Sequence, residues 1–301
     1  MKLEMVLSIS EMTIFLLLTG LGTVANVSVF VNYICTFMGS GEKSIHLILI
    51  HLAFTNITML FSKGVQTPIT ALGLRHFLGD VGCHIIVYLE RVARGLSICT
   101  SSLLTVVQAI IMSPRTSWWG RLRLRSVECV LLSLLFFWIL NSLISMNLLY
   151  SIRNRGTNIL QQSKNNKYCY IKKESQKVNN MFLALMVLRD AVFQSAMGGA
   201  SGYMVLLLHK HHQHVLYLQN SKLLYRTPPE LRAAQSVLLL MLCFLFFYLA
   251  DCAVSLYLSF SLKNDSLTMH LQQFLTLGYA ILSPFILIHR DGHLAECWHA
   301  Q

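Results

Sequence analysis

Residues 83–125 read CHIIVYLERVARGLSICTSSLLTVVQAIIMSPRTSWWGRLRLR. This stretch decides which class of fold the whole chain adopts. The first thirty of these residues are apolar enough to cross a hydrocarbon core about 30 Å thick as a helix. The segment opens with Cys83 and carries three charged residues in its first half: Glu90, Arg91 and Arg94. After Pro114 comes a basic loop with Arg115, Arg121, Arg123 and Arg125. This pattern predicts a membrane-spanning helix with a polar region toward one end and a basic loop at the other.

The composition of the whole chain agrees with a membrane protein. Of its 301 residues, 54% are hydrophobic and 12% are charged, and the mean hydropathy is +0.56. Soluble globular domains contain roughly 25% charged residues. The net charge of +11 would also suit a nucleic-acid-binding protein. In membrane proteins, however, basic residues gather in loops beside headgroups and cytoplasm, so we expect a lipid membrane and no nucleic acid as their partner.

Seven apolar segments are long enough to span a bilayer, which takes about 20 helical residues. They lie at 12–37, 45–71, 81–112, 126–150, 181–208, 231–260 and 269–289. The first is too long for the apolar core of a signal peptide, so we expect it to stay in the protein. The sequence predicts an all-α membrane protein, a seven-transmembrane helix bundle that forms one domain over residues 1–301. Its N-terminal segment would be about 1–11 and its tail about 290–301.

The orientation in the membrane depends on cysteines rather than on charge. With the N-terminus outside, Lys and Arg divide equally, ten on each side, so the positive-inside rule does not decide. Cys83 and Cys169 would face the same side, and a disulfide between them requires an oxidising compartment. We therefore predict a Cys83–Cys169 disulfide, against the alternative of two free thiols, and an extracellular N-terminus. On that side Asn264 begins a glycosylation sequon, whereas the sequons at Asn26 and Asn56 lie inside predicted helices.

Inserting an ionisable side chain into the centre of a membrane span costs at least about 2.5–3.5 kcal/mol on insertion scales. We therefore expect each such side chain to have a structural partner or a functional role. Glu90 and Arg94 are four residues apart, share a helix face and are able to pair. Two interpretations stay open for them. They form either the polar floor of a ligand pocket in the outer half of the bundle or a structural ion pair that holds helices together.

Other spans contribute further candidates for such a pocket. Arg189 and Asp190 are adjacent and point apart, so we expect each to meet a different helix. Asp251 is expected to pair with Arg94 or Lys63. Two tyrosines in the last two spans have a polar tip suited to a cavity wall, although tyrosines in spans also serve as packing. The predicted ligand-binding residues are Glu90, Arg91, Arg94, Arg189, Tyr248, Asp251 and Tyr279.

The remaining polar and special residues in the spans have structural interpretations. Asn26 and Asn56 are placed to hydrogen-bond across a helix interface. Three glycines of the fifth span permit close approach or bending, and Pro284 is expected to kink the seventh. The histidine-rich run 209–214 is interpreted as a solvated basic patch. Neither a nucleophile–base motif nor a phosphate-binding loop is present, so we expect no enzyme, no cofactor and no metal site.

A set of short stretches becomes specific when their order and spacing are taken together. They are KSIHLILIHLAFTN (43–56), FSKG (61–64), RVARGLSI (91–98), LTVVQAI (104–110), MSP (112–114), YCY (168–170), RD (189–190), SGYM (201–204), PELRAAQ (229–235) and SPFILI (283–288). In this arrangement the chain resembles the vomeronasal type 1 receptors, a branch of the rhodopsin-like G-protein-coupled receptors. The resemblance covers about residues 10–295.

The resemblance implies a pheromone or odour receptor in the plasma membrane of sensory neurons. Such a receptor would bind a small pheromone or odorant and activate a heterotrimeric G protein of the Gi/Go class. The third helix of rhodopsin-like receptors usually ends in Asp-Arg-Tyr, and the seventh usually contains Asn-Pro-x-x-Tyr. Here the chain has Val107-Gln108-Ala109 and Ser283-Pro284-Phe-Ile-Leu287, and Asn56 replaces the usual mid-span aspartate. The charged lock and the sodium site are therefore expected to be absent, and the residues expected to couple to the G protein are Gln108, Arg115, Arg121 and Arg123.

Two alternative functions remain at this point. A receptor similar to the bitter taste receptors would share the architecture but bind other ligands, and the motifs of the third and seventh spans favour the vomeronasal family over it. A membrane transporter or channel is the second alternative. The sequence carries neither an inverted repeat nor the paired broken helices that transporters show.

Overall fold

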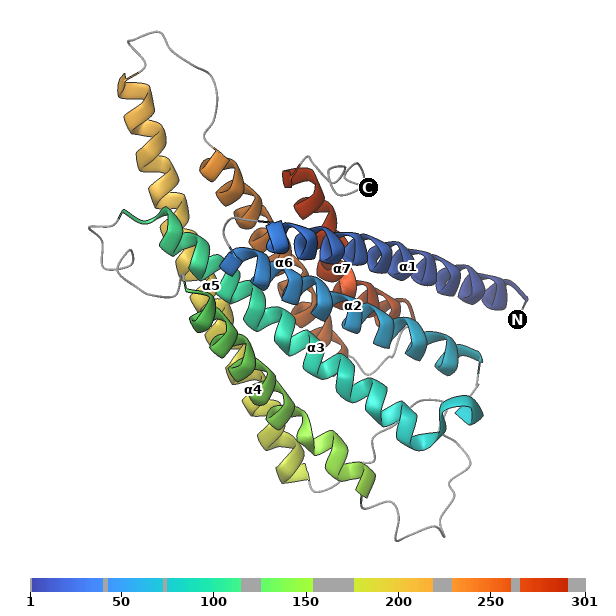
Figure 1. Cartoon of the computed structure of the whole chain (residues 1–301). Coiled ribbons are helices and arrows are strands. Elements are labelled where there is room, and N and C mark those ends of the chain that lie inside the picture. The colour runs from blue at the N-terminus through green and yellow to red at the C-terminus, as the bar shows by residue number, and fades with distance from the viewer. Residues whose placement is uncertain are drawn as a thin grey trace.

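The computed structural model describes residues 2–39, 43–72, 75–114, 126–153, 176–218, 229–260 and 266–291. Their secondary structure consists of seven helices in chain order (Figure 1). The helices are α1 (Lys2–Gly39), α2 (Lys43–Leu72), α3 (Arg75–Met112), α4 (Val127–Arg153), α5 (Gln176–Leu218), α6 (Pro229–Phe260) and α7 (Ser266–Asp291). The predicted all-α, seven-helix architecture is confirmed.

The helices are longer than the predicted spans because several continue beyond their apolar part. α1 has 38 residues and α5 has 43, and a helix rises about 1.5 Å per residue, so both exceed the hydrocarbon thickness. Figure 1 shows the C-terminal part of α5 extending past its neighbours. Among the described side chains, six helices contain a stretch suited to crossing a membrane, and α6 contains a shorter apolar stretch over 238–251. These features describe a multi-pass membrane protein.

α3 is the central helix of the bundle. It contacts α2, α4, α5 and α6, and Figure 1 shows it running through the middle of them. Within its apolar stretch 83% of the residues are buried, against 22–56% in the other five. Large apolar side chains on α4 and α5, such as Leu132 and Leu206, are instead exposed. An apolar outer surface of this extent suits contact with lipid rather than with water.

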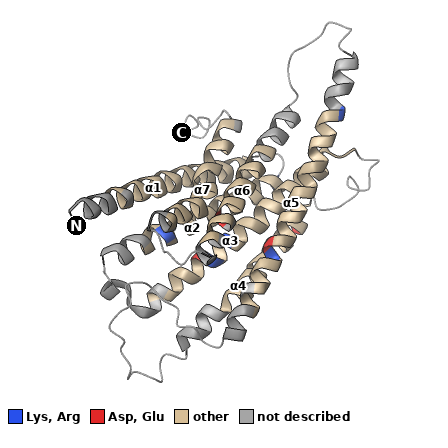
Figure 2. Cartoon of the chain, turned by 180° about the vertical axis from the view of Figure 1, so that it is seen from behind, with Lys and Arg blue, Asp and Glu red and all other residues tan. Residues whose placement is uncertain are grey.

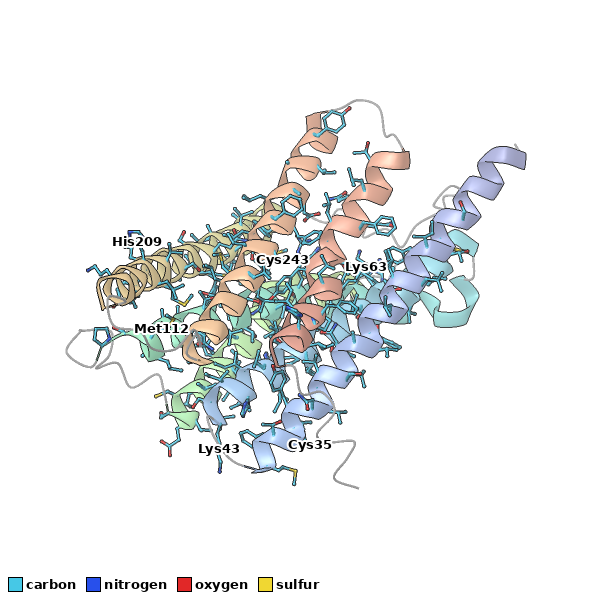
Figure 3. The ribbon with its side chains drawn as sticks, turned by 90° about the horizontal axis from the view of Figure 1, so that it is seen from above. Cys35, Lys43, Lys63, Met112, His209 and Cys243 are labelled. Atoms are coloured by element: carbon cyan, nitrogen blue, oxygen red, sulfur yellow. The ribbon has the colours of Figure 1, made fainter. Side chains whose placement is uncertain are left out.

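Most of the charged side chains that the structure describes come from the middle parts of α2, α3, α5 and α6, whereas Lys43, Glu128 and Lys210 are exposed near helix ends. Figure 2 shows blue and red segments in the middle of the bundle and a further blue segment far along α5. Viewed from above, Lys63 and Cys243 lie within the bundle, and Cys35, Lys43, Met112 and His209 lie toward the end where α1, α3 and α5 finish (Figure 3). The polar interior is thus separated from that helix end by the apolar parts of the spans.

A buried amide network joins four helices at mid-depth. Asn56 Nδ2 donates to Asn26 Oδ1 at 3.3 Å and to Ser283 Oγ at 3.0 Å, and Asn56 Oδ1 accepts from Ser97 Oγ at 3.2 Å. The predicted hydrogen bond between the two asparagines is therefore confirmed. Both sequon asparagines are buried, as expected for sequons inside helices. The side chain of Asn56 on α2 thus connects its helix to α1, α3 and α7.

The glycines of α5 do not serve close helix packing. A Cβ atom added at Gly198, Gly199 or Gly202 would have no heavy atom within 4 Å, because these positions face outward. The prediction of close approach at these positions is wrong. Close approach occurs instead at Gly278 of α7, where an added Cβ would lie 2.1 Å from Cε1 of Phe247. The missing side chain lets the aromatic ring of α6 pack directly on the α7 backbone.

Candidate ligand-binding site

The centre of the candidate site is an ion pair between α3 and α6. Arg94 Nη2 lies 2.5 Å from Asp251 Oδ2, and Thr276 of α7 donates a hydrogen bond to Asp251 Oδ1 at 2.9 Å. The Asp251 side chain is 5% exposed and that of Arg94 is 35% exposed. Both oxygens of the carboxylate have a partner, so Asp251 ties α6 to α3 and α7. The structure confirms the predicted pairing of Asp251 with Arg94.

A second ion pair joins α2 to α3. Lys63 Nζ lies 2.8 Å from Glu90 Oε1, and both side chains are largely buried. Glu90 and Arg94 thus each pair with a neighbouring helix, although their spacing would also allow them to pair with each other. The physical reason is charge compensation, because removing the partner of a buried charge is strongly destabilising. A Glu90–Arg94 pair within α3 would have left Lys63 and Asp251 without these partners.

Arg189 and Asp190 of α5 form a third charged pair. Arg189 Nε donates to Asp190 Oδ1 at 2.8 Å, and Nη2 lies 2.6 Å from the same oxygen. The prediction that these two side chains point apart is wrong. The long arginine side chain curls back to its neighbour, because both groups are buried and an unpaired charge there is costly.

The same pair also reaches two other helices, as predicted. Arg189 Nη1 donates to Asn141 Oδ1 of α4 at 2.6 Å, and Tyr248 of α6 donates to Asp190 Oδ2 at 3.3 Å. A polar chain therefore runs from α4 through α5 to α6. Together with the Arg94–Asp251 pair, it places compensated charges beside the part of α3 that contains Arg94 and Gly95.

Gly95 makes the approach of α4 and α5 to α3 possible. A Cβ atom at this position would lie 1.9 Å from Asn141 Oδ1 and 2.3 Å from Arg189 Nη1. Asn141, Thr276 and Gly95 were not among the residues predicted from the sequence. The first two carry the same signal as Arg94, a polar side chain in an apolar span. Gly95 carries no such signal, because only the packed structure shows what lies against it.

A cavity lies beside the Arg94–Asp251 pair. Its empty space, counting the open mouth, is about 380 Å³. Aromatic and aliphatic side chains dominate the lining, with a few polar groups among them, which is typical of small-molecule sites. The lining residues are Met59, Arg94, Ser97, Ile98, Phe244, Phe247, Tyr248, Asp251, Leu275, Thr276 and Tyr279.

The structure brings four of the predicted ligand-binding residues together in this lining: Arg94, Tyr248, Asp251 and Tyr279. Glu90, Arg91 and Arg189 lie outside it. Glu90 forms its ion pair with Lys63 of α2. Arg189 bonds to Asp190, which accepts a hydrogen bond from Tyr248 in the cavity wall.

Tyr279 lines the cavity, and its hydroxyl is bonded within the bundle. The hydroxyl lies 2.9 Å from Ser101 Oγ of α3, and either oxygen is able to donate. Phe244 of α6 packs edge-to-face on the ring, with the ring centroids 4.6 Å apart. The side chain is buried, and through these contacts Tyr279 joins α3, α6 and α7.

The residues predicted for G-protein coupling and for modification are described only in part. Gln108 lies on α3 and is 4% exposed, so its side chain is covered in this structure. Ser113 follows the last residue of α3, and its Oγ lies 2.9 Å from Tyr203 OH of α5. The predicted sites outside the described residues are Arg115, Arg121, Arg123, Cys169 and Asn264, together with the side chain of Cys83. The disulfide and the glycosylation therefore remain predictions.

Comparisons with known proteins identify the relatives of this chain. A family model described as the vomeronasal organ pheromone receptor family matches residues 9–300. The chain is 32% identical over 280 residues to human vomeronasal type-1 receptor 4, covering 91% of each protein. It is 37% identical over 224 residues to mouse vomeronasal type-1 receptor 51, covering 72% of this chain and 68% of the mouse protein.

The fold has a counterpart among solved structures. Squid rhodopsin superposes with a TM-score of 0.69 at 15% sequence identity, covering 96% of this chain and 84% of rhodopsin. At that identity the likeness concerns the fold alone, and it is the fold of a G-protein-coupled receptor. The family match decides against the transporter and bitter-taste alternatives. The chain belongs to the vomeronasal organ pheromone receptor family and is a chemosensory G-protein-coupled receptor rather than an enzyme.

Proposed function

We propose that this receptor binds a small pheromone or odorant in the cavity beside Arg94 and Asp251 and then activates a Gi/Go-type G protein. One observation carries the proposal. The ion pair that lines the cavity is also the contact that ties α6 to α3 and α7. A molecule in the cavity therefore touches the contacts that hold α6 in place.

α6 presents two polar side chains to this cavity, three residues apart and so on one helix face. Tyr248 bonds to α5 through Asp190, and Asp251 bonds to α3 and α7. A ligand that binds more tightly when these contacts are rearranged shifts the population toward that state. In this mechanism α6 moves relative to α3, and shifts of packed helices are a common way for proteins to switch between states.

The movement of α6 would open the cytoplasmic end for the G protein. Gln108 is covered in this structure and would become accessible only when the helices around it separate. The C-terminal helix of the G protein would then dock in the cleft as a helix in a groove. Arg115, Arg121 and Arg123 of the following loop would assist this docking and also meet anionic lipid headgroups.

The proposed orientation places the N-terminus outside, in the plasma membrane of sensory neurons. Cys83 lies in the first part of α3, toward the end of the helix opposite to Gln108. A Cys83–Cys169 disulfide and a glycan on Asn264 would then face the extracellular side. The cavity beside Arg94 lies between these two ends, in the half nearer Cys83.

Nucleotide exchange tests the proposed coupling. Receptor in membranes would be mixed with purified Gi or Go heterotrimer and with a panel of volatile and steroid-derived compounds. We expect at least one compound to accelerate exchange on Gi or Go, and the Leu275→Trp variant, which fills the cavity, to lose that response. A compound that accelerates exchange only on another G-protein class would contradict the Gi/Go assignment. A response that survives Leu275→Trp would contradict the position of the ligand.

A further inference from the structure

We infer that the ligand of this cavity is uncharged: a compact, mainly apolar molecule with a hydrogen-bond-accepting oxygen directed at Arg94. The inference rests on the proposed function, because it assumes that the ligand occupies the cavity beside the Arg94–Asp251 pair. It goes further by naming the chemical class that the charges, hydrogen bonds and shape of the lining accept.

The first argument is charge balance. The lining contains one cationic and one anionic side chain, and these two are in contact with each other. An ionised ligand would have to take one of them from its partner, and the other would remain as an uncompensated charge in a largely buried site. The neighbouring charges of the pairs Lys63–Glu90 and Arg189–Asp190 are engaged in the same way. A neutral ligand leaves all three pairs intact.

The second argument is the hydrogen-bonding capacity of the lining. Asp251 accepts from Arg94 on one oxygen and from Thr276 on the other, and its side chain is buried. A guanidinium carries five N–H groups. Among the described residues Arg94 is bonded to Asp251 through Nη2, about a third of its side chain is exposed, and it lines the cavity. The lining therefore has most of its donor capacity left on Arg94, whereas each oxygen of its carboxylate already accepts one hydrogen bond.

The hydroxyl groups of the lining do not change this balance, because they are engaged within the protein. Tyr248 donates to Asp190, and Ser97 donates to Asn56. The hydroxyl of Tyr279 is bonded to Ser101. An amine would thus have to share carboxylate oxygens that already accept from Arg94 and Thr276, while a carbonyl or ether oxygen finds unbonded N–H groups on Arg94.

The third argument is shape and apolar area. The rest of the wall consists of side chains such as Phe244, Phe247 and Leu275. Even with its open mouth counted, the empty space is about 380 Å³, which limits the ligand to a compact molecule. Such a wall favours a compact hydrocarbon body, with its oxygen at the polar corner where α3 meets α6.

Matched probes that differ only in their polar group test the inference. On the bornane skeleton they are bornane, camphor, bornylamine and bornyl sulfate, and the same four types would be made on the p-menthane and cyclododecane skeletons. Binding to purified receptor in detergent is measured by the shift in unfolding temperature and by titration. We expect the ketone on at least one skeleton to bind about tenfold or more tightly than its ammonium and sulfate analogues, a ratio that corresponds to ~1.4 kcal/mol. We also expect it to bind more tightly than the hydrocarbon.

Two variants should change this preference in opposite directions. In Asp251→Asn the charge of Arg94 loses its counter-charge, so the sulfate should gain relative to the ketone. In Arg94→Gln the ammonium should gain instead. Glu128→Gln is the matched control, because Glu128 is exposed in the first turn of α4, outside the lining and the three ion pairs, and its loss should leave the preference unchanged. If a single variant does not fold, the double variant Arg94→Gln/Asp251→Asn keeps a neutral hydrogen-bonded pair and should still prefer the ketone over both ionised analogues.

An ionised analogue that binds as well as the ketone in the unaltered receptor would overturn the inference, and so would a panel in which no ketone binds. These outcomes are distinct from failure of the proposed function, because binding is measured without a G protein. A ketone that binds but never accelerates exchange on Gi or Go would contradict the coupling alone. A sulfate that accelerates exchange and loses its effect in Leu275→Trp would support the receptor function and contradict the ligand class.

Discussion

Arg94 and Asp251 are 157 residues apart in the sequence, and their side chains meet at 2.5 Å between Nη2 and Oδ2. Through this contact the central helix α3 holds the helix that is proposed to move. Asp251 is also bonded to Thr276 of α7, so one carboxylate fixes three helices at the edge of the cavity. The predictions below follow from this contact and from the packing around it.

Replacement of Arg94 separates the functional interpretation of the ion pair from the structural one. We expect Arg94→Ala to impair the response to an activating ligand while surface expression stays close to that of the unaltered receptor. The reason is that Arg94 lines the cavity and supplies the N–H groups there. Ligand-dependent nucleotide exchange and surface labelling of intact cells check this together. Failure of the variant to reach the surface would favour a purely structural role.

Removal of the charge of Asp251 should raise activity without ligand. Asp251→Asn weakens the tie between α3 and α6, and couplings of this kind are typically worth about 1–3 kcal/mol, or roughly 5–150-fold in the equilibrium between states. Nucleotide exchange in the absence of any ligand measures the effect. Glu90→Gln removes a charge from the α2–α3 pair and should leave the basal rate near that of the unaltered receptor. Equal basal rates in all three proteins would mean that the Arg94–Asp251 pair does not hold the resting state.

Gly95→Ala should destabilise the receptor. Its Cβ atom would overlap Asn141 and Arg189, and overpacking of a tightly packed interior costs typically about 1–3 kcal/mol. Gly198→Ala is the matched control, because that position faces open space and alanine is favoured over glycine in a helix by up to about 1 kcal/mol. Thermal unfolding of the purified proteins in one detergent compares them. The packing argument fails if the two variants unfold at the same temperature.

Asn56→Asp should lower the unfolding temperature although the two side chains have nearly the same shape. The amide nitrogen of Asn56 donates to Asn26 Oδ1 and Ser283 Oγ, and a carboxylate oxygen in its place would face the Asn26 oxygen without a proton. A buried polar group left without its partner costs about 1–3 kcal/mol, and more when it is charged. Asn56→Ala, measured beside it, removes the hydrogen bonds without adding charge. An Asn56→Asp variant as stable as the unaltered receptor would show that the network tolerates the charge.

The predicted disulfide can be tested by comparing single and double variants. If Cys83 and Cys169 are joined, Cys83→Ser, Cys169→Ser and the double variant should lose the same stability, about 2–5 kcal/mol as for other native disulfides. Cys129→Ser removes a described free thiol of α4 and should have little effect. Thermal unfolding with and without reductant provides the measurement. Additive losses in the double variant would show that the two thiols act independently.

The sequence by itself determined that the chain is an all-α membrane protein, because apolar runs of bilayer length must satisfy their backbone hydrogen bonds internally as helices. It also marked the charged residues that need partners, since such residues are rare in spans. Motif order then led to the family that the comparisons confirm. Each of these properties is local or sequential, so it can be recognised without knowing which helices touch.

The choice of partners was decided by the tertiary structure. Spacing along α3 allowed Glu90 to pair with Arg94, yet Glu90 bonds to Lys63, and Arg94 bonds to Asp251 on another helix. Gly95 gave no signal in the sequence, but it is a position where side chains of α4 and α5 lie against the backbone of α3. Helical periodicity fixes the face on which a side chain lies, whereas its partner depends on the rotation and depth of the neighbouring helix. Those are set by the packing of the whole bundle, and so is the cavity between α3, α6 and α7.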